Sequence, residues 1–100
     1  MVTHDIHDLP LSEWGELPAV LEGSVVEVEI VCAHPFGLGI KVLGLNAYGH
    51  VNAPEATDGR YTVEVASTWI GDVRSASVLG VSPGRQPTLT IRPSSVPPSR

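Results

Sequence analysis

The sequence predicts a small all-β domain, a five-stranded Greek-key barrel with a short N-terminal helical turn and flexible tails. Several short segments alternate between apolar and polar residues, and glycine, proline and asparagine stand between these segments. The length agrees with this, because 100 residues with 42% hydrophobic content can build one modest core and no second one. Strand spacing alone does not separate a barrel from a β-sandwich, so the sandwich stays as the alternative architecture.

The N-terminal segment, residues 1–22, is expected to be an arm that carries one short helical turn. Its first part, through Leu11, has no apolar periodicity and should be solvated. Pro18 and Gly23 then bracket a short stretch, as proline does in a first helical turn and glycine just past the last. Trp14 and Leu17 are expected to pack this arm over one end of the barrel.

Three strands are expected to follow as a meander. The first begins at Ser24, and its outer face carries Glu27 and Glu29. The second follows the turn at residues 34–35, and the third ends before Pro54. The residues predicted to face inward are Val26, Val28, Ile30 and Cys32 in the first strand, Leu38, Ile40 and Val42 in the second, and Val51 in the third.

The second half of the chain should supply two more principal strands. Tyr61, Val63 and Val65 alternate well enough to predict a short extra strand, whose pairing stays open. The fourth strand is expected over residues 72–81 and the fifth over 88–92, after a turn at 82–85. The barrel domain is predicted to span residues 23–93, and 94–100 to form a flexible tail. The inward residues here are Ala76, Val78, Leu89 and Ile91, with Arg74 interrupting the apolar pattern.

The charge of the chain limits its possible partners. The formal net charge is -5, and Lys41 is the only basic residue in the first half, against seven acids. The second half is close to balanced because it carries five arginines. Affinity for phosphate comes mainly from lysine and arginine, so any nucleic-acid binding should be weak or confined to one local site.

The first residues and the hydropathy make the cytoplasm the expected compartment, and the single cysteine limits the possible chemistry. Cys32 is the only cysteine, so it can form neither an internal disulfide nor a thiolate zinc site, and we expect a buried core thiol. The first residues, 1–8, carry acids and histidines where a signal peptide needs basic and then apolar residues. No apolar stretch is long enough to span a bilayer, so no membrane partner is expected.

No apparatus for catalysis is visible, and we expect a binding module, not an enzyme. The serines lack a nucleophile-elbow context, and no phosphate-binding glycine loop precedes a helix. A group of metal-capable side chains lies in the arm, where ordering them would cost about 1–2 kcal/mol per residue. We therefore expect no metal site and no cofactor. The side chains in question are His4, Asp5, His7 and Asp8.

Several segments together resemble a known family. The segments are Gly23-Ser-Val-Val-Glu-Val-Glu-Ile30, His34-Pro-Phe-Gly-Leu-Gly-Ile-Lys41, Tyr48-Gly-His-Val-Asn52, Ile70-Gly71, Ala76-Ser-Val-Leu-Gly-Val81 and Leu89-Thr-Ile-Arg92. In order and spacing, over about 70 residues, they resemble the RNA-binding domain repeated in ribosomal protein S-one, which is an OB fold.

This resemblance implies a stacking platform for single-stranded RNA, made in that family by two aromatics of the second strand and a histidine of the third. Phe36 matches the first aromatic, whereas Gly39 and Asn52 stand where the second aromatic and the histidine would be. Tyr48 and His50 share a predicted face with Asn52 and could replace the missing rings. The candidate RNA-binding residues are Phe36, Lys41, Tyr48, His50, Asn52, Arg74 and Arg92, with lysine and arginine contacting phosphate. The alternative is a protein-interaction module on the same fold that has lost RNA binding.

Overall fold

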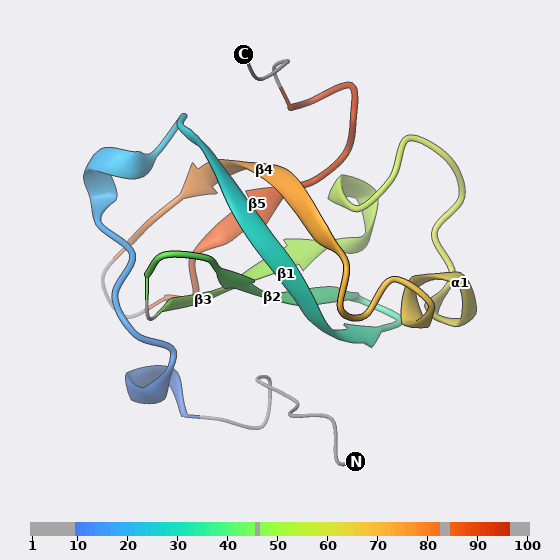
Figure 1. Ribbon diagram of the computed structural model, residues 1–100, viewed down its shortest axis with the longest axis horizontal. Coiled ribbons are helices and arrows are strands. Elements are labelled where there is room, and N and C mark those ends of the chain that lie inside the picture. The colour runs from blue at the N-terminus through green and yellow to red at the C-terminus, as the bar shows by residue number, and fades with distance from the viewer. Residues whose placement is uncertain (1–9, 46, 83–84, 97–100) are drawn as a thin grey trace.

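The computed structural model describes residues 10–45, 47–82 and 85–96, and five strands close into a barrel within them (Figure 1). The order around the barrel is β1-β2-β3-β5-β4, with a parallel contact between β3 and β5 and antiparallel pairing elsewhere. This is the arrangement of a small OB-like barrel, so the predicted fold class is confirmed. The strands are β1 (Val25–His34), β2 (Gly37–Val42), β3 (Ala47–Asn52), β4 (Val73–Gly80) and β5 (Thr88–Thr90).

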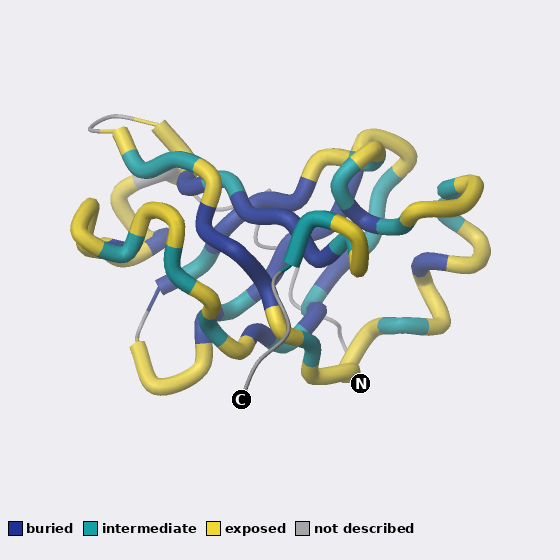
Figure 2. The backbone as a smooth tube through the Cα atoms, turned by 90° about the horizontal axis from the view of Figure 1, so that it is seen from above, coloured by how far each residue is buried: buried dark blue, intermediate teal, exposed yellow. Residues whose placement is uncertain are grey.

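The barrel interior is filled by the residues that alternate inward along each strand. Figure 2 shows the buried chain running through the centre, with exposed loops around it. Ile30 pairs with Ile40, and both are fully buried, as predicted. Gly49 also faces inward, where a Cβ would come within 2.5 Å of the Leu89 Cδ1 atom. A larger residue at this position would therefore disturb the core.

A β-bulge changes which face Cys32 occupies. Ile30 pairs with Ile40, but Cys32 pairs with Gly39, so Val31 is one residue extra on β1. Cys32 therefore leaves the barrel interior and lies on the outer face, where it packs with Trp14 and apart from the main core. The predicted burial of the thiol is confirmed, whereas its predicted place on the Ile30 face is wrong.

The expected extra strand around residue 63 is also wrong, because α1 (Val63–Ser67) is a short helix. The Thr62 side chain accepts a hydrogen bond from the Val65 amide at 3.2 Å, which caps the first turn of the helix. Glu64 adds a negative charge in that first turn. The alternation of valines thus reflects a helix of five residues whose Ala66 is buried against the core.

The arm runs along one side of the barrel and carries the 3-10 turns η2 (Leu11–Glu13) and η3 (Ala19–Leu21) (Figure 1). Trp14 and Leu17 are both buried, as predicted, and η3 is the expected helical turn. The Trp14 carbonyl accepts a hydrogen bond from the Tyr48 amide at 2.7 Å. The arm therefore covers part of the β3 edge.

The C-terminal segment makes hydrogen bonds to the connection after β3 as far as the structure describes it. A third 3-10 turn, η4 (Ala53–Glu55), follows β3, and the Glu55 carbonyl accepts a hydrogen bond from the Ile91 amide. Both the amide and the hydroxyl of Ser94 donate to the Asp58 carboxylate. The acid and histidine group of residues 4–8 and the tail end 97–100 lie outside the described residues. Among the described residues, none of the helices combines the length and the hydropathy needed to span a bilayer.

Candidate nucleic-acid interface

Three rings stack where the β1–β2 turn meets β3. The Phe36 and His34 rings are 4.8 Å apart at their centroids, with planes inclined by 9°. Phe36 and His50 are 5.8 Å apart and inclined by 23°. Phe36 nevertheless keeps 54% of its surface exposed, so it is an outer ring and not a core aromatic. We call these three residues the ring stack.

The backbone around Phe36 is held on both sides. Gly37 has φ +150°, and a Cβ there would come within 2.1 Å of the Val51 carbonyl oxygen, so only glycine fits this close approach. The Phe36 carbonyl accepts a hydrogen bond from the Ala53 amide at 3.0 Å. The exposed ring of Phe36 therefore projects from a fixed turn, which reduces the entropy lost when a ligand binds.

His50 links the ring stack to Asn52. Its Nε2 atom lies 2.9 Å from the Asn52 Oδ1 atom, and since an amide oxygen only accepts, Nε2 donates. Burial lowers the pKa of His50 below its ordinary value, the hydrogen bond to Asn52 opposes this change, and nearby His34 adds to it. His50 is therefore an uncharged ring at neutral pH, suited to stacking more than to neutralising phosphate.

An open groove of about 710 Å³ begins at this pair and crosses the weak β3–β5 contact to the β4–β5 loop. Arg85 is exposed in this groove and brings a positive charge to it. We call it the first groove. The described residues that line it are His50, Asn52, Gly80, Ser82, Arg85, Gln86 and Thr88.

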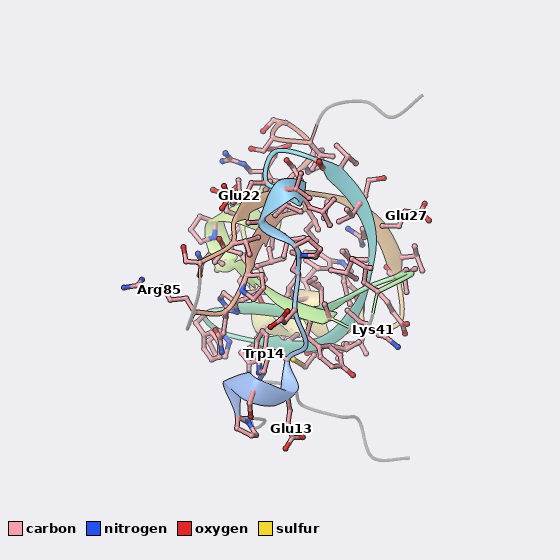
Figure 3. All side chains as sticks on the ribbon, turned by 90° about the vertical axis from the view of Figure 1, so that its left-hand side faces the viewer. Glu13, Trp14, Glu22, Glu27, Lys41 and Arg85 are labelled. Carbon is pink, nitrogen blue, oxygen red and sulfur yellow. The ribbon has the colours of Figure 1, made fainter. Side chains whose placement is uncertain are left out.

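Lys41 and Tyr48 lie on the same outer face of the sheet but away from the first groove. Lys41 is paired with Glu29 on one side and Tyr48 on the other, so an acid lies directly opposite its charge. Tyr48 packs against the buried cluster of Trp14 and Cys32. Figure 3 shows Lys41 and Arg85 extending from opposite sides of the barrel, with Trp14 between them. The arm thus covers the surface that would join Lys41 to the groove.

Arg74 and Arg92 are held by other partners. The Arg74 guanidinium lies 5.2 Å from the Trp69 ring centroid, and its Nη2 atom is 3.1 Å from the Asp72 carboxylate. Arg92 lies between Glu55 and Asp58, with its Nε atom 3.8 Å from an oxygen of each. Neither arginine is among the described residues lining the first groove.

Of the seven sequence candidates, the structure brings together Phe36, His50 and Asn52. His34 and Arg85 complete this group, and sequence analysis did not select them. Position was the available signal, because His34 ends β1 next to a turn and Arg85 lies in the β4–β5 connection of a barrel whose loops commonly bind ligands. Comparison with known proteins adds no assignment, since neither a family model nor a curated protein matches the chain.

Proposed function

We propose that this domain binds single-stranded RNA weakly, with a base stacked on Phe36 and a phosphate beside Arg85. The observation that carries the proposal is the ring stack, in which Phe36 contacts both histidine rings and still keeps 54% of its surface exposed on a fixed turn. Stacking of a base on an aromatic side chain contributes about 1–3 kcal/mol and tolerates any sequence. The resemblance to the S-one RNA-binding domain supports the same ligand.

The acidic balance of the chain agrees with a weak interaction. The net charge of -5 repels RNA at long range, and Glu29 opposes Lys41. Arg85 remains as a phosphate contact in the first groove, while Asn52, Gln86 and Thr88 offer hydrogen bonds. One or two phosphate contacts predict a shallow dependence on salt, because each contributes a slope of about −0.7 on single strands.

The test is an amide-shift titration with mixed-sequence single-stranded RNA at low salt, followed by affinity measurements on two variants. Phe36→Ala should weaken binding by about 1–3 kcal/mol and, since the ring is exposed, leave folding nearly unchanged. Val65→Ala, a matched truncation of an exposed residue on α1, should bind like the parent protein. Absence of shift changes at Phe36, His50 and Asn52 with millimolar RNA would contradict the proposal.

That negative result would favour the second candidate, a protein-interaction module. The observation behind it is the exposure of three apolar side chains in and after α1, where Val65, Ile70 and Val73 are 49%, 39% and 54% exposed. Exposed apolar residues grouped along the chain can mark a protein contact. This candidate predicts that substitutions in the ring stack have no effect on binding to the partner.

A further inference from the structure

A second groove of about 900 Å³ continues the first one beyond Arg85. Both grooves are lined by Ser82 and Arg85, so they meet at the β4–β5 loop. The arm forms the opposite wall of the second groove, through Ser12 and residues 15–19. Its lining is more apolar than that of the first groove and includes Leu17, Pro18, Ala19, Val81 and Pro87.

We infer that the arm and the described residues of the β4–β5 loop form a second subsite for an extended single strand of RNA, which leaves the ring stack at His50, follows the first groove and passes Arg85. This inference rests on the proposed function and extends it. A strand whose base stacks on Phe36 would meet Arg85 at the junction, where a phosphate fits the guanidinium. The next nucleotides would lie against the apolar wall of the arm.

The position of the arm excludes a strand of RNA that runs from the ring stack across the sheet toward Lys41. The buried indole of Trp14 packs on Cys32 and Tyr48, between the labelled Lys41 and Arg85 side chains (Figure 3). A strand leaving the ring stack toward Lys41 would have to displace this fully buried side chain. The path past Arg85 is already open, so it needs no rearrangement of the arm.

The charge of Glu16 allows the path past Arg85 to be tested. It is exposed and lines the second groove together with Arg85, so its carboxylate should repel the phosphates of a strand lying there. A ligand too short to pass Arg85 would not meet Glu16. Replacing this acid by lysine should therefore favour long strands and leave short ones unaffected.

The experiment compares Glu16→Lys with Glu13→Lys, using single-stranded uridine oligomers of three and eight nucleotides. Glu13 is an exposed acid of the same arm that is not among the residues described in either groove, and it points outward, away from Arg85 (Figure 3). Both variants change the net charge equally. Glu16→Lys should raise affinity for the octamer by about three- to ten-fold, with little change for the trimer. Glu13→Lys should change both by less than about two-fold.

A second variant tests the groove by filling it. Ala19 is exposed in η3 and lines the second groove, so Ala19→Trp should weaken octamer binding and spare the trimer without disturbing the core. Equal effects of the two lysine variants on the octamer, or an equal gain of Glu16→Lys for both lengths, would overturn the second subsite while leaving RNA binding intact. Failure of the parent protein to bind either oligomer would overturn the proposed function as well.

Discussion

The Tyr61 hydroxyl donates a hydrogen bond to the main-chain carbonyl of His34, 27 residues earlier, at 2.6 Å. The same hydroxyl lies 3.1 Å from the Gly37 carbonyl. One side chain thus reaches the two ends of the turn that carries Phe36. Burial raises the pKa of Tyr61, so the hydroxyl stays protonated as a donor near neutral pH.

Tyr61→Phe should reduce the free energy of unfolding by about 1–2 kcal/mol, because the part-buried His34 carbonyl loses the hydroxyl that donates to it. Urea unfolding followed by tryptophan fluorescence measures this change. Tyr48→Phe, which removes the same atom from a ring packed on Trp14 and Cys32, should cost less. A Tyr61→Phe protein as stable as the parent would show that the turn does not depend on the Tyr61 hydroxyl.

Ile30 and Glu29 lie on opposite faces of β1, so we expect their replacement to have very different effects on the free energy of unfolding. Ile30→Ala should destabilise the domain by about 2–5 kcal/mol, since this side chain is fully buried in the barrel. Glu29 points outward at the next position, so Glu29→Ala should be nearly silent. Chemical denaturation of the two variants measures the difference, and equal losses would mean that the β1 faces are reversed.

Alternation of apolar residues was sufficient to predict the five principal strands and most of the core. It failed where one residue interrupts the period, because the bulge at Val31 moves Cys32 to the outer face without any change in the apolar pattern. It also failed around Val63, where β-branched residues favour a strand but Thr62 caps a helix and Tyr61 bonds to the distant β1–β2 turn.

The candidate site was predictable only in part for a related reason. Phe36, His50 and Asn52 were within reach of sequence analysis because they share strand periodicity or a family position. His34 stacks on Phe36 across the short β1–β2 turn, whereas Arg85 joins the group through the closure of the barrel, which places the β4–β5 loop beside His50 and Asn52. Lys41 is separated from that group by Trp14, and no local pattern reveals where an arm will pack.

Stability should fall as the pH falls from neutral, in part because of His50. Its pKa in the folded protein is lowered from 6.5 by burial, so the unfolded chain binds the proton more readily. Neutral His50 therefore makes its full contribution to the free energy of unfolding above about pH 6.5. This contribution is lost progressively as the pH falls from there through the lowered folded-state pKa.

Urea unfolding at several pH values between neutral and mildly acidic conditions tests whether stability falls on acidification. His50→Gln should reduce the dependence on pH, whereas His34→Gln, the matched change in the same ring stack, should keep most of it. A parent protein that gains stability on acidification over this range would contradict the assignment of a lowered pKa to His50.

The arm should control access to the only thiol of the chain. Trp14 is fully buried and Cys32 is 4% exposed, and the two side chains form one cluster outside the barrel. Trp14→Ala should cost about 3–5 kcal/mol, and Trp14→Leu less, because leucine leaves a smaller cavity. In the folded Trp14→Leu protein, Cys32 should react with a thiol reagent much faster than in the parent.

This measurement also tests the bulge. If β1 kept a regular period, Cys32 would lie inside the barrel with Ile30. A thiol reagent would then reach Cys32 only when the whole domain unfolds, whether or not Trp14 is replaced. With the bulge at Val31, the thiol lies on the outer face in one cluster with the indole, so reactivity should rise well beyond what the loss of global stability accounts for. Equal rates in the two proteins, once corrected for that loss, would place Cys32 in the barrel core and remove the separate Trp14 cluster.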